Sequence, residues 1–332
     1  MAQTNQFDDF IIDAAQYAKW NRSIFQQMRN GGVSCVNATL VYWESARETL
    51  SEIGKWNRLF QENDDLIMQV RTAEDVRLAR SINKTGICFA FQHCSPIEED
   101  IDLVEIMHTL GVRFMQLSYN NQSLCATGCY ETEDTGITRF GKQVIREMNR
   151  VGMVIDMSHS GEKSTLDAID ISERPISITH ANPKSWHPAL RNKSDDLLKA
   201  LSESGGMLGF SMYPFHLKNG SNCSILEFCE MIASAADRLG IGFLGIGSDL
   251  VQGHGNEVVE WMRNGRWSRE MDFGEGSASN AGWPVPVTWF SGNDDFSNIE
   301  TGLSQVGFNK DEIKQIMGLN WLKFFENSFG PQ

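Results

Sequence analysis

The sequence has little positive charge for its size. Its 332 residues carry 29 lysine and arginine side chains against 43 aspartate and glutamate side chains, a formal net charge of −14. Proteins that follow a nucleic-acid backbone or lie on an anionic membrane use clustered basic residues, and no basic cluster occurs in this sequence. We therefore expect neither nucleic acid nor a membrane as a partner.

Long apolar runs are also missing. No uninterrupted apolar stretch approaches the roughly 20 residues of a membrane-spanning helix. The first ten residues, MAQTNQFDDF, lack the basic and apolar regions of a signal peptide. These absences predict a cytoplasmic protein. Hydrophobic residues still make up 41% of the chain, which is enough to fill a sizeable core.

Cysteine is scarce. The chain has seven cysteines, an odd number in a protein too large to need disulfides for stability. Most are expected to be reduced thiols in the core. Cys125 and Cys129 have the spacing of half a metal site, but no second pair accompanies them, so a core role is favoured.

What the sequence does contain is a repeated unit: an amphipathic helix, a glycine, a short apolar run rich in β-branched residues, and a polar residue. The glycine can end the helix in the left-handed conformation, and a run that is apolar on both faces is typical of a buried parallel strand. Pro175 replaces the glycine in one copy, and the first strand has no helix before it. The eight predicted strands lie within residues 8–17, 29–42, 84–94, 109–121, 149–160, 172–183, 203–214 and 238–249.

Eight such units in about 250 residues, with right-handed crossovers, predict an α/β fold of the (β/α)8 TIM-like barrel type. A doubly wound open sheet is the alternative. Apolar residues at steps of three and four predict helices with one apolar stripe facing the sheet. The residues of these stripes are Phe140, Val144, Ile145, Met148 and Val151 in one helix and Leu103, Ile106 and Leu110 in another.

The chain reads as one domain over residues 1–332, because no Ser/Gly-rich or Pro-rich linker interrupts the repeated units. Residues 251–295 break the periodicity and predict an irregular loop near the mouth of the barrel. A last amphipathic pattern, from Ile313 through Ile316 to Leu322, predicts a C-terminal helix.

Polar residues follow the predicted strands, at the end where a barrel of this type carries its active site. They are Asp13 to Tyr17, Asn37, Gln92 with His93, Tyr119 with Asn120, His159, His180, Tyr213 and Asp249. His159 and His180 end consecutive strands, so they would face each other and could share a divalent metal through neutral imidazole nitrogens. Asp249 could bind metal or move a proton. A simple hydrogen-bonding role for each histidine remains open.

Further charged and polar residues lie near the same face. Arg191 could hold a substrate carboxylate in a bidentate fork; a surface ion pair with Asp195 or Asp196 is the alternative. Three histidines in predicted loops are candidates for contact with substrate or metal: His93, His187 and His254.

Five motifs, in this order, resemble the membrane (renal) dipeptidase family, zinc peptidases on an amidohydrolase-type barrel: MNRVGMVIDMSHSG, PISITHANP, LRNKSDDLLKAL, GGMLGFSM and GIGSDLVQG. The resemblance extends over about residues 8–325. It implies that His159 and His180 bind one zinc and that Arg191 binds the carboxylate of the substrate. It also implies that Asp249 serves the other zinc and the protonation step.

The sequence departs from the family at the second zinc. The family's first strand ends in Asp-Gly-His-x-Asp, and its histidine and second aspartate hold that zinc, whereas residues 13–17 here read DAAQY. The bridging glutamate of the family matches Gln92, and its substrate-binding histidine matches Tyr119. A neutral amide cannot bridge two cations as a carboxylate does. A two-zinc centre is therefore not expected.

The leading hypothesis is a metal-dependent hydrolase of a dipeptide or another small carboxylate-bearing amide. His159 and His180 would hold one divalent metal, zinc or another, with Gln92 or His93 as the candidate third ligand. Asp249 would act as base or acid. Three further residues would bind or shape the substrate beside Arg191 and His254: Tyr119, Asn120 and Gln92. A site that works without metal is the alternative.

Two other functions stay open. One is a dipeptidase-like enzyme for a small amine or amino-acid derivative, in which aromatic residues near the mouth cage a cationic or methylated nitrogen: Tyr17, Trp20, Tyr119, Trp186 and Trp261. The other is a non-catalytic homologue that serves in binding or assembly. The family resemblance favours a homodimer or larger homo-oligomer.

Overall fold

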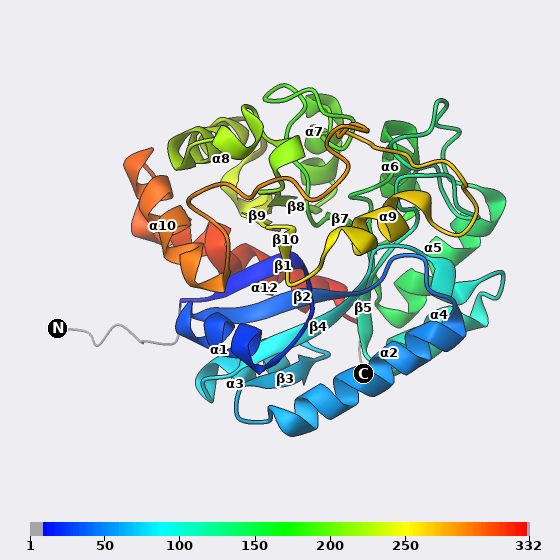
Figure 1. Ribbon diagram of the computed structural model, residues 1–332, viewed down its shortest axis with the longest axis horizontal. Coiled ribbons are helices and arrows are strands. Elements are labelled where there is room, and N and C mark those ends of the chain that lie inside the picture. The colour runs from blue at the N-terminus through cyan, green and yellow to red at the C-terminus, as the bar shows by residue number, and fades with distance from the viewer. Residues whose placement is uncertain (1–8, 331–332) are drawn as a thin grey trace.

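The computed structural model describes residues 9–330, and it shows a closed barrel of eight parallel strands surrounded by helices (Figure 1). Each barrel strand pairs in parallel with the next, and the last pairs with the first through Asp13 and Ile246. The predicted (β/α)8 barrel is therefore confirmed. Its strands are β1 (Ile11–Ala18), β2 (Val33–Val41), β4 (Thr85–Phe91), β5 (Val112–Gln116), β6 (Val154–Asp156), β7 (Ser177–Ile178), β8 (Met207–Phe210) and β9 (Leu244–Ile246).

Twelve α-helices occur in the part of the chain that the structure describes, and none of them is long and apolar enough to cross a membrane. The N-terminal stretch that bears on a signal peptide falls mostly outside the described residues. The helices are α1 (Arg22–Asn30), α2 (Ala46–Glu62), α3 (Ala73–Ser81), α4 (Asp102–Thr109), α5 (Arg139–Val151), α6 (Glu162–Ile171), α7 (Asp195–Glu203), α8 (Ile225–Leu239), α9 (Asn256–Asn264), α10 (Phe296–Gln305), α11 (Lys310–Lys314) and α12 (Asn320–Ser328).

The two predicted apolar stripes have different outcomes. In α5, Val144, Ile145 and Met148 are buried as predicted, and Gly152 ends the helix in the left-handed conformation. In α4 the prediction was wrong in part, because Ile106 is 50% exposed while Val104 and Met107 are buried. A short helix with apolar residues on most of its surface does not reveal from spacing alone which side faces the strands.

Two strands were not predicted. β3 (Ile67–Val70) pairs with the first half of β4, and β10 (Leu250–Gln252) pairs with the end of β1. α9 and all of β10 except its first residue, Leu250, lie in the segment 251–295 that was expected to be irregular. The remainder of that segment has few regular elements, and Figure 1 shows it in gold to orange, running from α9 toward α7 and back to α10.

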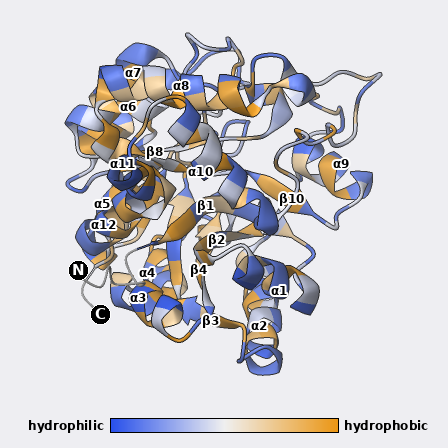
Figure 2. Ribbon diagram, turned by 90° about the vertical axis from the view of Figure 1, so that its left-hand side faces the viewer, coloured by the Kyte–Doolittle hydropathy of each residue, from blue (hydrophilic) through white to orange (hydrophobic). Residues whose placement is uncertain are grey.

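The predicted C-terminal helix closes one end of the barrel. It comprises α11, a π-helical turn (Gln315–Leu319) and α12. Trp321 of α12 is fully buried and donates its indole N–H to the carbonyl of Ile246 at 3.0 Å. Gly245 makes room for it, since a Cβ there would lie 2.3 Å from the indole nitrogen. Figure 2 places α12 on the side of the molecule opposite α9, which leaves the other end of the barrel for a site.

Candidate functional site

One cavity at the carboxyl ends of the strands collects most of the predicted site residues. It encloses about 70 Å³. The residues predicted from the sequence that line it are Gln92, Tyr119, Asn120, His159, Arg191, Tyr213 and Asp249. His180 lies directly behind His159, because their Nε2 atoms are 3.0 Å apart.

The two histidines meet as the order of the strands predicted. His159 follows β6 and His180 follows β7, so they come from neighbouring strands. Both rings are buried. Burial, together with the nearby Arg191 guanidinium, holds the pKa of both imidazoles well below the ordinary histidine value. Both rings are therefore neutral at physiological pH.

The hydrogen bonds of His180 fix which of its nitrogens carries the proton. The buried carboxylate of Asp156 accepts bonds from the backbone N–H and hydroxyl of both Ser158 and Thr179. Since the Thr179 hydroxyl donates its one hydrogen to Asp156 at 2.5 Å, its oxygen can only accept from Nδ1 of His180, 2.8 Å away. His180 thus carries its proton on Nδ1, and its Nε2 is a bare lone pair.

His159 is held in the same tautomer by different partners. Its Nδ1–H donates a hydrogen bond to the amide oxygen of Asn120, 2.7 Å away. Its ring stacks on Tyr119 with centroids 4.1 Å apart, and its backbone N–H donates to Gln116. The Nε2 lone pair of His159 accepts from Arg191 at 3.3 Å. Two lone pairs therefore face each other across 3.0 Å with no hydrogen between them.

Facing lone pairs repel unless a cation lies near both. Neutral imidazoles whose Nδ1–H groups are fixed by neighbouring acceptors are the usual form of metal-ligating histidine, so His159 and His180 fit one divalent metal. They do not make a two-metal centre. Within residues 9–330 no three histidine, cysteine, aspartate or glutamate side chains converge closely enough to hold a metal, so water or substrate would complete the coordination.

Two cations are buried beside the histidines. Arg191 and Lys193 are each 2% exposed. Arg191 donates to the carbonyl oxygens of Ser158 and His180, and Lys193 donates to the carbonyl of Ser160 at 2.6 Å. Neither forms an ion pair with any carboxylate among the described residues, so the alternative for Arg191, a surface ion pair with Asp195 or Asp196, is not what the structure shows. Burial lowers the pKa of Lys193 to about 8. Of the two, Arg191 lines the cavity, so its guanidinium is the buried cation that an anionic group in the cavity could reach.

Three carboxylates line the cavity, and Asp249 is the one that follows a barrel strand; the others, Asp272 and Glu275, lie in the segment 251–295. The backbone of Asp249 adopts a left-handed conformation, φ 58°, and its N–H donates to the carbonyl of Ala15. Asp13, within β1, holds this turn by accepting from the backbone N–H of Ser248 at 2.7 Å. Burial raises the pKa of Asp249 to about 6, although Arg191 opposes the shift. Asp13 was expected at a strand end; it is instead a buried support of Asp249.

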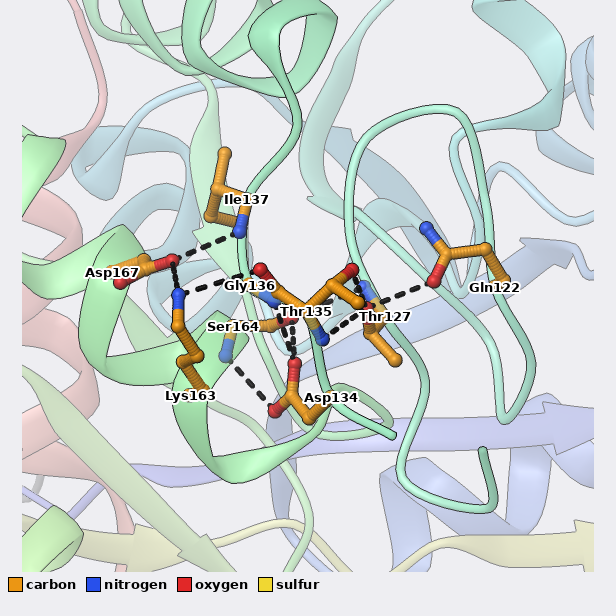
Figure 3. Close-up of polar contacts among 9 residues, drawn as sticks. All are labelled: Gln122, Thr127, Asp134, Thr135, Gly136, Ile137, Lys163, Ser164 and Asp167. Carbon is orange, nitrogen blue, oxygen red and sulfur yellow. Dashed lines mark hydrogen bonds and ion pairs between the residues drawn. The ribbon is translucent and has the colours of Figure 1, made fainter. Parts of the chain in front are cut away.

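The loop between β5 and α5 carries Tyr119 and Asn120, and Figure 3 shows how it is fastened to α6. Asp134 accepts from the backbone N–H of Ser164 at 3.0 Å and from its hydroxyl at 2.7 Å. Asp134 therefore caps the start of α6, whose own N-cap residue is a glycine. Because α6 begins just after His159, this cap connects the loop that carries Tyr119 and Asn120 to the segment that carries His159.

Other predicted residues lie elsewhere. His93 lines a separate cavity beside Trp43, and its Nδ1 accepts from the backbone N–H of Ser95. His254 stacks on Tyr17 outside the first cavity, with centroids 4.2 Å apart. Neither contacts the histidine pair. The side chain of Gln92 donates to the Thr39 hydroxyl, and no contact with the pair is present.

The proposed aromatic cage is only partly assembled. Tyr119 lines the cavity, while Tyr17 and Trp261 pack around it. Trp20 instead packs on Trp56 in the main core. Trp186 is also away from the cavity. Two cavity tyrosines, Tyr130 and Tyr213, had not been proposed for the cage.

Comparison with known proteins decides the family. The family model of membrane dipeptidase, peptidase family M19, matches residues 10–265. The chain belongs to this family. An amidohydrolase from Pseudomonas aeruginosa of known crystal structure is 35% identical, superposes with a TM-score of 0.92, and each chain covers 98% of the other. Membership of the M19 family implies a divalent metal.

More distant M19 proteins share the fold. A dipeptidase described as an M19 metallopeptidase is 18% identical with a TM-score of 0.81, over 98% of this chain and all of that one. Dipeptidase tcpJ of Claviceps purpurea is 24% identical over 287 residues, which is 85% of this chain and 60% of the relative. The chain spans about half to three-fifths of the length of the curated relatives it matches.

Proposed function

We propose that this M19 protein hydrolyses a small amide that bears a carboxylate, such as a dipeptide. Family membership supports the reaction class. The observation that carries the proposal is the pair of unprotonated Nε2 atoms of His159 and His180, 3.0 Å apart, with Arg191 donating to the first, beside a cavity that also contains Asp249. Cation ligands, an anion-binding group and a proton carrier are thus combined in one site.

His159 and His180 would hold one divalent metal, and zinc is the metal of the family. When bound, such a metal polarises a carbonyl and lowers the pKa of a bound water. Gln92 is a weaker candidate for a ligand, because its amide nitrogen already donates to Thr39 and only its oxygen remains. Two imidazoles without a carboxylate predict weak binding of the metal.

Arg191 would bind the carboxylate of the substrate. Its guanidinium has five N–H donors in a planar fork, and the described contacts are to two backbone carbonyls and to His159. A carboxylate would give this buried cation the anion it lacks. Because Arg191 is anchored by the backbone of both histidine segments, it would hold the substrate in a fixed position relative to them.

Asp249 would move the proton. With a pKa of about 6 it is ionised at neutral pH and basic enough to take a proton from water that attacks the amide carbonyl. The oxygen of that water bonds to the carbonyl carbon, the C–N bond breaks, and the proton passes from Asp249 to the departing nitrogen. The products are a carboxylate and an amine.

Metal analysis of the purified protein, together with hydrolysis assays on a panel of dipeptides, tests the proposal. We expect bound zinc, or turnover restored by added zinc or manganese, and loss of both in His180→Ala. His187→Ala is the matched control, since His187 does not line the cavity. Less than about a tenth of an equivalent of metal, with no turnover restored by metal, would contradict the proposal.

A small amine or amino-acid derivative is a second candidate substrate, and one observation favours it. Three of the five tyrosines, Tyr119, Tyr130 and Tyr213, line the cavity with Asp249, and aromatic faces beside a carboxylate attract a cationic nitrogen. Binding of tetramethylammonium that is lost in Tyr119→Ala would support this candidate. A cytoplasmic location and a homo-oligomer remain predictions.

A further inference from the structure

A second cavity adjoins the first at Asp249. The two cavities have four wall residues in common, and Asp249 is the only carboxylate among these four. The shared residues are Tyr213, Asp249, Val251 and Trp283. Trp283 is held in place by its indole N–H, which donates to the carbonyl of Gly255 at 3.1 Å. Asp249, the proposed proton carrier, therefore lies in the wall that the two cavities share.

The walls of the second cavity are mostly apolar. Its apolar residues outside the shared set are Met212, Pro214, Leu250, Pro284, Pro286 and Phe290. The hydroxyl of Ser248 is engaged by Asp13. His254 lies flat against Tyr17, and burial keeps the pKa of its ring below the ordinary value. Among the described residues, no lysine or arginine lines this space, in contrast to the first cavity with Arg191 and Arg263.

The two cavities also differ in size. The first encloses about 70 Å³ and the second about 190 Å³. An apolar protein cavity of roughly 150 Å³ accepts a molecule of benzene. The second cavity can therefore take a branched aliphatic or aromatic side chain, whereas the first has room for little beyond a carboxylate and a small substituent.

We propose that the second cavity is the subsite for an apolar group on the acyl side of the scissile amide. This inference rests on the proposed function, because Arg191 fixes the carboxylate in the first cavity and Asp249 serves the amide nitrogen. The remaining half of the substrate then extends past Asp249 into the apolar space. The preferred substrate is a small carboxyl-side residue, such as glycine, acylated by a large apolar residue.

The isomers Leu-Gly and Gly-Leu test this orientation, since they have the same atoms and charges in reversed order. Each buried methylene contributes about 0.8 kcal/mol, so burial of a leucine side chain predicts at least tenfold tighter binding of Leu-Gly. Binding is measured by calorimetry with the zinc-supplemented full-length protein, and hydrolysis is measured separately. Equal binding of the isomers, tighter binding of Gly-Leu, or no binding of either would overturn the subsite.

Met212→Gln places a polar group of similar length in the wall and is expected to remove most of the preference for Leu-Gly. Met262→Gln is the matched control, because Met262 lines only the first cavity; the ratio of the two affinities should not change. If Met212→Gln does not fold, Pro286→Glu at the exposed rim replaces it. Tight binding of Leu-Gly without hydrolysis would contradict the proposed reaction and leave the subsite intact.

Discussion

A single hydroxyl determines the chemistry of His180. Thr179 is adjacent to it in sequence, yet the two side chains act together only because Asp156, on the neighbouring strand β6, takes the hydroxyl proton. The carboxylate thus acts on the imidazole through Thr179, and its effect is to expose the Nε2 lone pair toward His159. Neutral ligands placed in this way bind metals better than rings that are free to rotate.

Thr179→Val should therefore weaken metal binding with little change of shape. The variant leaves Nδ1 of His180 without its acceptor, and loss of an outer hydrogen-bond partner of this kind typically costs 10–100-fold in metal affinity. Zinc titration measures the affinity, and nitrogen chemical shifts of the histidine rings report the tautomer. Thr179→Ser keeps the hydroxyl and should retain both properties. Unchanged affinity and ring shifts in the valine variant would show that the hydroxyl does not position His180.

The buried charge of Asp249 reduces the free energy of unfolding at neutral pH. Its folded pKa is about 6 against an ordinary 3.8, so the folded state binds the proton more tightly and stability falls as pH rises between these values. Asp249→Asn removes the charge, and asparagine tolerates the left-handed backbone. The variant should lose activity yet gain at most about 3 kcal/mol at pH 8 and about 1 kcal/mol at pH 4.5.

Urea unfolding of chelator-treated protein at the two pH values measures these differences. Asp156→Asn is the contrasting variant, because Asp156 accepts four hydrogen bonds that an amide cannot accept in full, and it should be destabilised at both pH values. A gain for Asp249→Asn that does not grow with pH would refute the assigned shift. In wild type, activity should decline below about pH 6 as Asp249 becomes protonated.

At the scale of elements, the position of the loop after β5 depends on α6. Asp134 gives the first turn of that helix the cap that Gly161 cannot supply. Asp134→Ala should cost about 1–2 kcal/mol of stability and speed amide exchange in the loop. Since the loop carries Asn120, substrate and metal binding should weaken as well. Asp170→Ala, an exposed aspartate on the same helix, is the control; equal effects of the two variants would argue against the cap.

Elements with a strong local pattern could be predicted from the sequence. The apolar runs, most of them preceded by a glycine, predicted all eight barrel strands, because a strand buried on both faces is largely apolar. β3 could not be recognised, since its middle residues, Met68 and Gln69, are half-buried. β10 pairs with β1, an interaction between segments more than 200 residues apart that no local pattern contains.

At the scale of the whole molecule, the same distinction explains what could be predicted of the site. His159, His180 and Asp249 follow strands, so barrel geometry gathers them from their positions alone. The hydrogen bonds that position these residues could not be predicted. Asp156 acts on His180 through Thr179, and Asp13 accepts from Ser248 beside Asp249. Both interactions cross between neighbouring strands, whose register is set by the closed barrel. Lys193 is buried two residues after Arg191, although a lysine beside acidic residues is typical of a surface.

Metal binding should stabilise the whole barrel, because its two ligands follow different strands and are brought together only in the folded state. A ligand present at 100 times its dissociation constant adds about 2.7 kcal/mol to the free energy of unfolding, which for a protein of this size is a shift of a few degrees. Thermal unfolding with increasing zinc should show this rise in wild type and not in His180→Ala. An equal rise in both proteins would place the metal elsewhere. Chelation should reverse the shift completely, since two imidazoles with no carboxylate predict a metal that exchanges readily.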